Sequence, residues 1–241
     1  MTQEDRKTKQ LKKIMQSAVK VFSARGYKEA RMSFIAKESG MALGTLYLYF
    51  KSKESLFNFL LKYIFFNDQD IRSIPVPISS PSWDWEITSG RNAFVYSKFC
   101  ALFEKPLKAD PTAGVHREFE AIIRNLCSIF NTYRHGIIML LRSSQNCPEL
   151  ADFYVNIVEE LMGLLVGYLN KRMARGLLRK VADVCASARF ILASIGWFAV
   201  HRHWTVHEVG FDEKVWEDTI VDALTHAFVP PRLQQPDGAK G

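Results

Sequence analysis

Apolar residues recur at spacings of three and four along most of this 241-residue chain, and this period limits the possible folds more than any other feature. Between residues 5 and 25 it produces one apolar stripe of an amphipathic helix, made by Leu11, Ile14, Ala18, Val21 and Phe22. No alternation of apolar and polar residues is long enough to predict a strand. The sequence therefore predicts an all-α fold.

Two short helices are expected to follow the first. Gly26 is expected to end the first helix as a C-terminal cap, and the letters RMSFIAKES, closed by Gly40, predict the second. A turn at residues 41 and 42 leads into a third helix over residues 43–50, and Ser52 is expected to cap a fourth. Two short helices joined by a glycine-containing turn and supported by a longer helix are typical of the helix-turn-helix. This arrangement suits DNA because an α-helix fits the major groove.

The positive charge of the chain is concentrated in its first quarter. Residues 1–66 hold 13 Lys and Arg against 5 Asp and Glu, a net charge of +8, whereas the remaining residues hold 19 against 20, a net charge of −1. A basic N-terminal module followed by a near-neutral remainder predicts a polyanionic partner for that module alone. Charge that serves only solubility is the alternative explanation.

The stretch GYKEARMSFIAKESGMALGTLYLYFKSKESLF resembles the DNA-binding module of the tetracycline-repressor (TetR) family of bacterial transcription regulators. The matching elements are the Phe22…Gly26-Tyr27 end of the first helix, Ile35-Ala36 and Gly40, Gly44-Thr45-Leu46-Tyr47, Phe50, and Lys51-Ser52-Lys53-Glu54. The resemblance implies an N-terminal three-helix DNA-binding domain and a C-terminal helical bundle for ligand binding and dimerisation. It also implies a homodimeric, sequence-specific regulator of double-stranded operator DNA, a repressor that a small hydrophobic effector releases.

The third helix supplies most of the expected DNA contacts. Leu46 and Phe50, four residues apart, are expected to face the core, which leaves the other residues of the helix for solvent or DNA. Leu43 and Leu48 can offer only apolar contacts to bases, best to thymine methyl groups. The resemblance carries DNA-binding roles over to Thr45, Tyr47, Tyr49 and Lys53. The full set of expected DNA-binding residues is Arg31, Ser33, Leu43, Gly44, Thr45, Tyr47, Leu48, Tyr49 and Lys53.

Arg31 departs from the family pattern. It stands where a Ser or Thr usually caps the second helix and touches a phosphate. Arginine has no acceptor oxygen for capping, but its guanidinium can bind a phosphate directly.

The chain beyond the module is predicted to form further helices. Residues 70–82, DIRSIPVPISSPS, hold three prolines and cannot form a continuous helix. Helices are predicted over residues 92–104, 114–131, 134–143, 148–175, 182–204 and 212–228. The predicted domains are residues 1–51 for DNA binding, 52–229 for ligand binding and dimerisation, and 230–241 as a disordered tail.

Two sets of residues in the second domain are candidates for further sites. A hydrophobic ligand pocket is predicted from Phe99, Phe103, Phe130 and Trp197, with His201 and Arg202 as polar anchors, and ordinary core packing is the alternative. Residues 190–200 are apolar around the whole helix, so a partner is expected to cover one side. The resemblance places the last two helices in a four-helix dimer interface, here with Ile191, Ile195, Phe198, Trp216, Ile220 and Leu224. A monomer core is the alternative.

Other classes of function find little support. The chain has no Gly-x-Ser-x-Gly motif, no phosphate-binding glycine loop and no matched carboxylate pair, so catalysis is not expected. The spacing of His201, His203 and His207 does not predict a metal site, and no cofactor is expected. Four dispersed cysteines, a charged N-terminus and an apolar stretch shorter than a bilayer predict a cytoplasmic protein without a membrane partner. The remaining alternative is an all-α small-molecule-binding protein whose helix-turn-helix lacks specific DNA readout.

Overall fold

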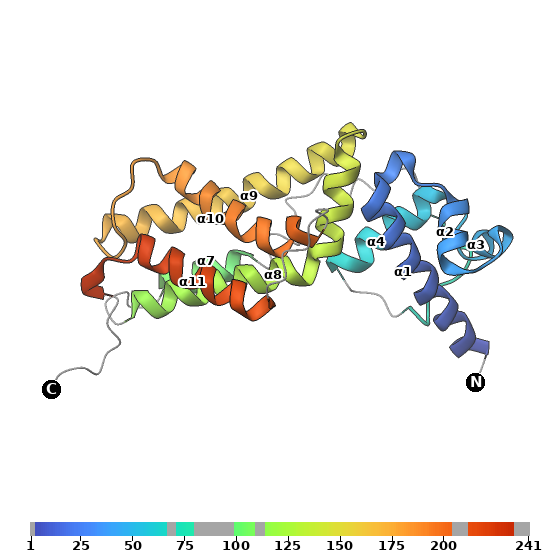
Figure 1. Cartoon of the computed structure of the whole chain (residues 1–241), viewed down its shortest axis with the longest axis horizontal. Coiled ribbons are helices and arrows are strands. Elements are labelled where there is room, and N and C mark those ends of the chain that lie inside the picture. Colours follow the sequence, from blue (N-terminus) through green and yellow to red (C-terminus); the bar gives the residue numbers. More distant parts are fainter. Residues whose placement is uncertain (1–2, 67–70, 80–98, 109–113, 204–211, 234–241) are drawn as a thin grey trace. The chain divides into compact units, whose positions relative to one another are not determined.

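The computed structural model describes residues 3–66, 71–79, 99–108, 114–203 and 212–233 (Figure 1). Within these ranges the regular structure is helical, with one isolated β-bridge, which confirms the predicted all-α fold. The α-helices are α1 (Gln3–Glu29), α2 (Met32–Ser39), α3 (Leu43–Tyr49), α4 (Lys53–Phe66), α7 (Ala101–Lys108), α8 (Val115–Ser144), α9 (Pro148–Ala174), α10 (Val184–Ala199) and α11 (Glu213–Phe228). Two short 3₁₀ helices are η2 (His201–His203) and η3 (Pro231–Leu233).

The chain divides into two compact units. Unit 1 comprises Met1–Phe94 and His135–Asn156, and unit 2 comprises Val95–Arg134 and Ile157–Gly241. Helices α8 and α9 therefore contribute residues to both units. The predicted boundaries at residues 51/52 and 229/230 stay predictions, and residues 234–241 of the expected tail lie outside the described residues.

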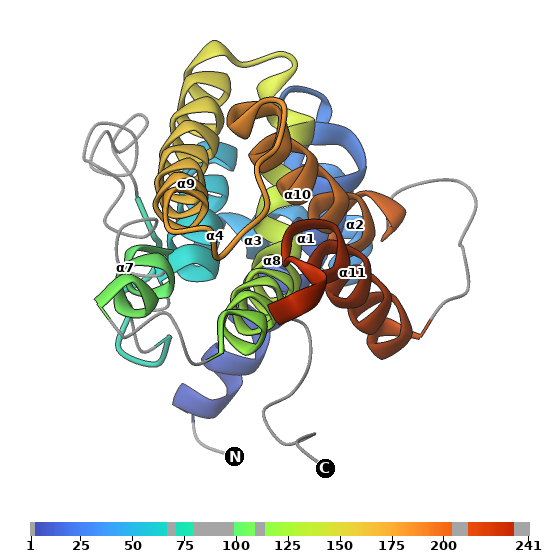
Figure 2. The same ribbon diagram turned by 90° about the vertical axis from the view of Figure 1, so that its left-hand side faces the viewer.

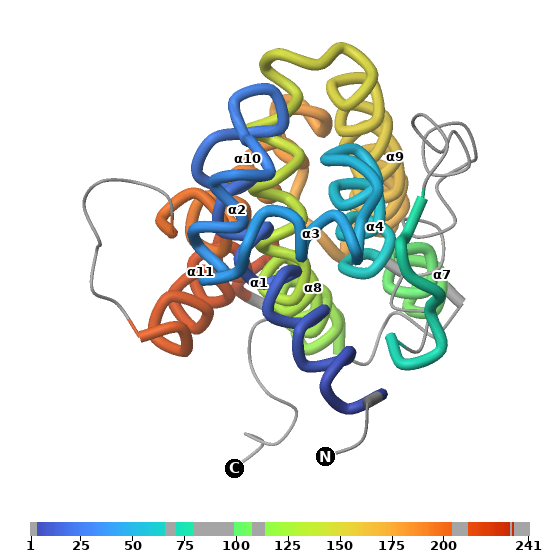
Figure 3. The backbone as a smooth tube through the Cα atoms, turned by 90° about the vertical axis from the view of Figure 1, so that its right-hand side faces the viewer, coloured from blue at the N-terminus to red at the C-terminus, as the bar shows by residue number. Residues whose placement is uncertain are grey.

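In unit 1, α1, α2 and α3 form the three-helix module that the sequence predicts (Figure 3). Its core holds the apolar stripe of α1 with the inward residues of α2 and α3, fully or almost fully buried: Leu11, Ile14, Ala18, Phe22, Ile35, Leu46 and Phe50. Gly40 ends α2 in the left-handed conformation, at φ 61° and ψ 32°. Ser52 accepts a hydrogen bond from the Ser55 N–H at 3.0 Å, as expected of a residue that caps α4.

Gly26 is the point at which α1 kinks. Its φ of 72° lies in the region that favours glycine, and helical hydrogen bonding resumes as far as Glu29. A Cβ at this position would stand 2.6 Å from the carbonyl oxygen of Arg142. The absence of a side chain therefore lets the end of α1 approach the last turn of α8, where the Tyr27 N–H donates to Ser143 Oγ at 3.0 Å.

Unit 2 holds α7, α10 and α11 with the parts of α8 and α9 that belong to it (Figure 2). Asp183 caps α10 by accepting from the Ala186 N–H, and Asp212 caps α11 by accepting from the Lys214 N–H. The two capped helices lie side by side. The faces that they bury in the unit include Ala188, Ile191, Ile195, Trp216, Ile220 and Leu224.

The structure corrects one predicted break. Residues 114–131 and 134–143 were expected as two helices, whereas α8 is continuous from Val115 to Ser144. No glycine or proline stands at residues 132 and 133, and Thr132 Oγ1 donates to the Ser128 carbonyl one turn back, which keeps it within the helix. Residues 92–98 of another predicted helix lie outside the described residues, and α7 covers Ala101–Lys108.

The apolar stretch over residues 190–200 lies within a longer helical segment. Among the described residues, Val184–His203 is the one helical segment long and apolar enough, by length and composition alone, to cross a membrane. This segment is longer than residues 190–200 and includes Arg189 and Arg202, and the absence of a membrane partner stays a prediction. Its buried residues Ala188, Ile191 and Ile195 nevertheless contribute to the core of unit 2, as in a core helix.

Candidate nucleic-acid interface

Helix α3 presents an exposed face beside the three-helix core. Leu43 is 42% exposed, Tyr47 47% and Leu48 67%, and these three are among the most exposed large apolar or aromatic side chains in the described chain. A Cβ added to Gly44 would have nothing within 4 Å. An open face of this kind on a short helix, supported by a second helix, can enter a major groove.

Leu46 and Phe50 are fully buried, which confirms their predicted place in the core. Thr45 is partly exposed. Tyr49 was expected to face outward. It is instead buried, and its phenol donates a hydrogen bond to Gln10 Oε1 of α1. The spacing of apolar residues did not predict this burial. Leu46 and Phe50 alone define the inward face of α3, and Tyr49 is buried beside them because it contacts α1. A phosphate contact from Tyr49 stays a prediction.

Lys53, at the start of α4, binds the end of α1. Its Nζ donates to the carbonyl oxygens of Tyr27 at 2.8 Å, Ala30 at 3.0 Å and Lys28 at 3.3 Å. The ammonium also lies 4.4 Å from the centroid of the Tyr27 ring. Partial burial lowers the pKa of Lys53. The side chain therefore neutralises the carbonyl end of a helix, a role the sequence did not suggest, and its predicted contact with DNA stays a prediction.

Arg31 and Ser33 are exposed at the start of α2. Arg31 makes no side-chain cap, as its lack of an acceptor oxygen predicts. The guanidiniums of Arg25 and Arg31 lie 4.6 Å and 5.7 Å from the Phe34 ring centroid, so two cations flank one aromatic side chain. This pairing makes Arg25 a further candidate for phosphate contact.

Lys37 of α2 and Lys51, which follows α3, are also exposed beside these elements. Neither lysine was predicted as a DNA contact, although the excess of positive charge over residues 1–66 was a usable signal. Arg25, Arg31, Lys37 and Lys51 are thus four exposed cations on or next to these helices in the chain. Binding to a polyanion requires such positive charge.

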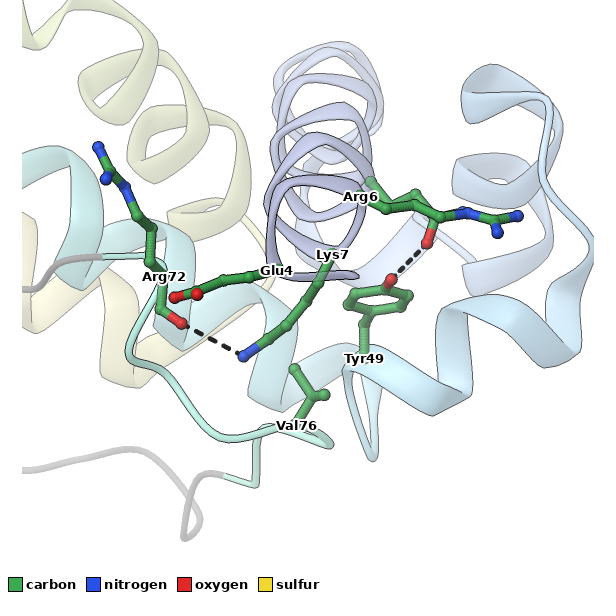
Figure 4. Close-up of a pocket in the computed structure, with 7 residues that line it drawn as sticks. Glu4, Arg6, Lys7, Tyr49, Arg72 and Val76 are labelled. Atoms are coloured by element: carbon green, nitrogen blue, oxygen red, sulfur yellow. Dashed lines mark hydrogen bonds between the residues drawn. The ribbon is translucent and has the colours of Figure 1, made fainter. Parts of the chain in front are cut away.

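Residues 71–79, which we call the strap, pair with the DNA-binding module. Ile78 and Phe50 form a parallel β-bridge, in which the Ile78 N–H donates to the Tyr49 carbonyl at 2.8 Å and the Lys51 N–H donates to the Ile78 carbonyl at 3.0 Å. Lys7 Nζ donates to the carbonyls of Ile74 at 2.6 Å and Arg72 at 3.5 Å. A pocket of about 690 Å³ lies among Glu4, Arg6, Lys7, Gln10, Tyr49, Arg72 and Val76 (Figure 4).

The predicted ligand residues fall into separate surroundings in unit 2. Phe99 and Phe103 are buried, and Phe103 lies 5.9 Å from Tyr168 between ring centroids. Phe130 is partly exposed against Gly196, whereas Trp197 is 43% exposed. Hydrophobic ligand binding by this set stays a prediction.

The two predicted polar anchors differ in environment. Burial lowers the pKa of His201. Arg202 is buried, with its guanidinium 5.9 Å from the Trp216 ring centroid and 3.8 Å from Glu213. Arg202 is therefore already engaged within the protomer.

A buried polar cluster in unit 2 was not predicted from the sequence. Arg172, with no exposed surface, donates to both carboxylate oxygens of Glu118 at 2.7 and 2.8 Å and to the Pro106 carbonyl at 2.7 Å. Tyr168 donates to Glu118 at 2.7 Å, and burial together with this bond raises the pKa of Tyr168 above its usual value. Arg172 Nη1 is buried and makes no hydrogen bond in the part of the chain that the structure describes.

The predicted dimer residues lie mostly in the protomer's own core. Ile191, Ile195, Trp216, Ile220 and Leu224 are buried, and Phe198 is partly exposed. The opposite face of α10 carries the exposed apolar side chains, namely Ala186, Phe190, Ala193 and Trp197, with Phe190 59% exposed. Within the described residues, no group of three or more His, Cys, Asp or Glu could hold a metal ion.

Comparison with known proteins assigns the chain to a family. The model of the bacterial regulatory proteins of the tetR family matches residues 14–59, which include α2, α3 and the start of α4. The chain is 42% identical over 213 residues to the fatty acid metabolism regulator protein of Bacillus subtilis (strain 168), covering 88% of this chain and 91% of that protein. The chain belongs to the TetR family. It is a DNA-binding transcriptional regulator with a helix-turn-helix, which confirms the regulator function predicted from the sequence.

Solved structures of TetR-family and related regulators share the fold. The transcriptional regulator FadR from Bacillus subtilis, solved in complex with stearoyl-CoA, is 21% identical with a TM-score of 0.50, over 89% of this chain and 97% of that one. AibR, solved in complex with isovaleryl coenzyme A and operator DNA, is 18% identical with a TM-score of 0.56, over 92% of this chain and 99% of that one. At these identities the likeness concerns the fold.

Proposed function

We propose that this TetR-family chain is a cytoplasmic, homodimeric repressor that binds operator DNA through α2 and α3 and is released by a long-chain acyl-coenzyme A thioester. The observation that carries the DNA-binding part is the exposed face of α3 with Leu43, Tyr47 and Leu48, flanked by exposed cations. The chain acts by binding alone, without catalysis.

The chemistry of this face predicts a particular kind of readout. Leu43 and Leu48 have no hydrogen-bonding groups, so they contact thymine methyl groups, while Tyr47 can donate its phenolic hydrogen to a phosphate. Sequence specificity then comes from apolar contacts that each contribute little binding free energy, and most of the affinity comes from the cations. The preferred half-site is therefore rich in A·T pairs at the positions that α3 meets.

Selection of bound duplexes from a random pool, repeated over a series of salt concentrations, tests this part of the proposal. We expect two enriched half-sites and an affinity that falls steeply as salt rises, because bound cations release counterions from DNA. Leu48→Ala is expected to weaken preference at thymine positions, whereas Lys37→Met is expected to weaken binding to all sequences. A pool without an enriched motif would instead support a ligand-binding protein that does not read sequence.

The homodimer is proposed from an uncovered surface. Ala186, Phe190, Ala193 and Trp197 follow one another at spacings of four, three and four along α10, so they form a single exposed stripe. A pocket of about 520 Å³ continues the surface from Phe190 to Ala227 of α11. A second copy that places the same stripe against this one removes the apolar area from water on both chains.

The effector class is proposed from the relatives. A relative with 42% identity is named as a regulator of fatty acid metabolism, and two proteins of the same fold were solved with acyl-coenzyme A thioesters. Unit 2 has features that suit such a ligand. Phe103 and Tyr168 supply apolar surface for an acyl chain, and the buried Arg172 Nη1 can donate a hydrogen bond to a thioester or amide carbonyl.

Calorimetric titration tests the effector class with three ligands. Palmitoyl-CoA is expected to bind, whereas coenzyme A lacks the acyl chain and palmitate lacks the nucleotide, so each is expected to bind more weakly. Equal binding of palmitate and palmitoyl-CoA would assign the effector to free fatty acids, and binding of none of the three would reject this class.

Within unit 1, α8 packs closely against α4. Gly136 of α8 meets α4 so closely that a Cβ there would stand 2.8 Å from Phe65 Cζ and 2.9 Å from Ile64 Cγ2. Helix α8 continues from residues of unit 2 into unit 1, and α4 begins four residues after α3 ends. We infer that a shift of α8 on effector binding moves α4, and with it the recognition helix.

A further inference from the structure

The recognition helix α3 is held at its C-terminal end from two sides. It has only seven residues, and a helix this short has little stability of its own. The side chain of its last residue, Tyr49, is bonded to Gln10 of α1. The backbone of the same residue accepts from the Ile78 N–H of the strap at 2.8 Å, and the Lys51 N–H just beyond donates back to Ile78.

Lys7 of α1 also binds the strap. Lys7 Nζ lies 2.6 Å from the Ile74 carbonyl and 3.5 Å from that of Arg72, and Figure 4 shows its side chain extending from α1 to the strap. Ile71 and Ile74 are buried, but the pocket of about 690 Å³ opens between α1 and Val76. Because packing is interrupted at this pocket, the hydrogen bonds of Lys7 and Ile78 contribute to holding the strap there.

We propose that the strap positions the recognition helix for operator binding, with Lys7 and Ile78 as its positioning residues. Through them the N-terminal part of α1 and the strap fix the direction of α3, so that Leu43, Tyr47 and Leu48 meet the base edges in one arrangement. Lys7 acts through the strap and not as a phosphate contact. The proposal concerns operator binding in the absence of any effector, so it does not depend on the identity of the ligand.

Lys7→Met and Lys9→Met form a matched pair that tests this role. Both remove one positive charge from α1, but only Lys7 binds the strap, whereas Lys9 is exposed and no hydrogen bond joins it to the strap. We expect Lys7→Met to weaken binding to the selected operator about tenfold more than Lys9→Met does, which corresponds to about 1.4 kcal/mol. Binding to a random duplex is expected to weaken equally in the two variants, since both lose the same charge.

Ile78→Pro tests the same role without a change of charge. Proline removes the N–H that donates to Tyr49, whereas Ile78→Ala keeps the backbone bond and serves as the control. We expect Ile78→Pro, but not Ile78→Ala, to reduce operator affinity about tenfold and to leave the salt dependence of binding unchanged. Circular dichroism and sedimentation establish that each variant is folded and has the oligomeric state of the parent.

Two results would overturn the proposal. One is equal loss of operator affinity in Lys7→Met and Lys9→Met, with the slope of affinity against salt reduced by about 0.9 in each, which would make Lys7 a phosphate contact. The other is full operator affinity in a folded Ile78→Pro variant. Either outcome leaves the proposed repressor function intact, because that function requires only that the operator is bound and that an effector releases it.

Discussion

The ammonium of Lys53 lies 2.8 Å from the carbonyl oxygen of Tyr27 and 4.4 Å from the centroid of its ring. Two further carbonyls, of Lys28 and Ala30, accept from the same nitrogen. One side chain thus joins the start of α4 to the end of α1. The lysine that follows the recognition helix therefore has a structural role whether or not it also meets a phosphate.

Lys53→Met is expected to destabilise the protein by about 1.5–3 kcal/mol, because hydrogen bonds to a charged group are lost and three carbonyls lose their partner. Lys51→Met is the matched control, since Lys51 is exposed and its side chain has no such carbonyls. Urea unfolding of both variants measures the difference. Equal stability of the two, with loss of DNA affinity in both, would contradict the capping role of Lys53.

Gly136→Ala is expected to disturb the contact between α8 and α4, because the new methyl group would stand 2.8–2.9 Å from Phe65 and Ile64. In a helix this substitution normally stabilises by about 0.5–1 kcal/mol, and Gly163→Ala, with nothing within 4 Å, is expected to show that gain. Thermal unfolding and operator affinity with and without effector measure both effects. If Gly136→Ala matched Gly163→Ala in every measurement, α8 would not act on α4 at this contact.

The cysteines are expected to react in two classes. Burial raises the pKa of the Cys127 thiol to about 12, so almost no thiolate forms there at pH 8, and Cys100 is also buried. Cys185 is exposed. At pH 8 iodoacetamide should modify Cys185 rapidly and Cys127 only after unfolding, as read by peptide mass spectrometry. Fast modification of Cys127 in the folded protein would contradict its burial.

Phe190→Asp is expected to dissociate the dimer, because it places a charge in the centre of the apolar stripe on α10. Val155→Asp is the control, since Val155 is also exposed and apolar but belongs to α9 and to unit 1. Sedimentation at micromolar concentration distinguishes them, and footprinting is expected to show protection of one half-site by the Phe190 variant. A dimeric Phe190→Asp variant would place the interface elsewhere.

The sequence predicted the helices and the core of the DNA-binding module well, because a single apolar stripe on a helix has one inward side. Leu46 and Phe50 follow from that rule, and they are buried. The burial of Tyr49 could not be predicted from that rule, since its hydrogen-bond partner Gln10 lies 39 positions away on α1. Contacts made through backbone carbonyls, such as those of Lys53, have no signature in side-chain spacing at all.

Helix α10 shows where periodicity stops being informative. Its residues are apolar on every side, so the sequence indicates that a partner covers one face without showing which. Ile191 and Ile195 were expected at the interface and lie in the protomer's core, whereas Phe190 and Trp197 are exposed. The buried Arg172–Glu118 pair was missed for another reason, since the two residues are 54 positions apart and neither belongs to a recognisable motif.

The measurement that tests the central claim most directly is the affinity for a selected operator duplex with and without palmitoyl-CoA. Fluorescence anisotropy at fixed salt gives both affinities, and coenzyme A alone controls for the charge of the ligand. We expect palmitoyl-CoA to weaken operator binding at least tenfold, which requires the ligand to prefer the DNA-free arrangement by about 1.4 kcal/mol. Unchanged operator affinity in a protein that calorimetry shows to be saturated with palmitoyl-CoA would contradict the account.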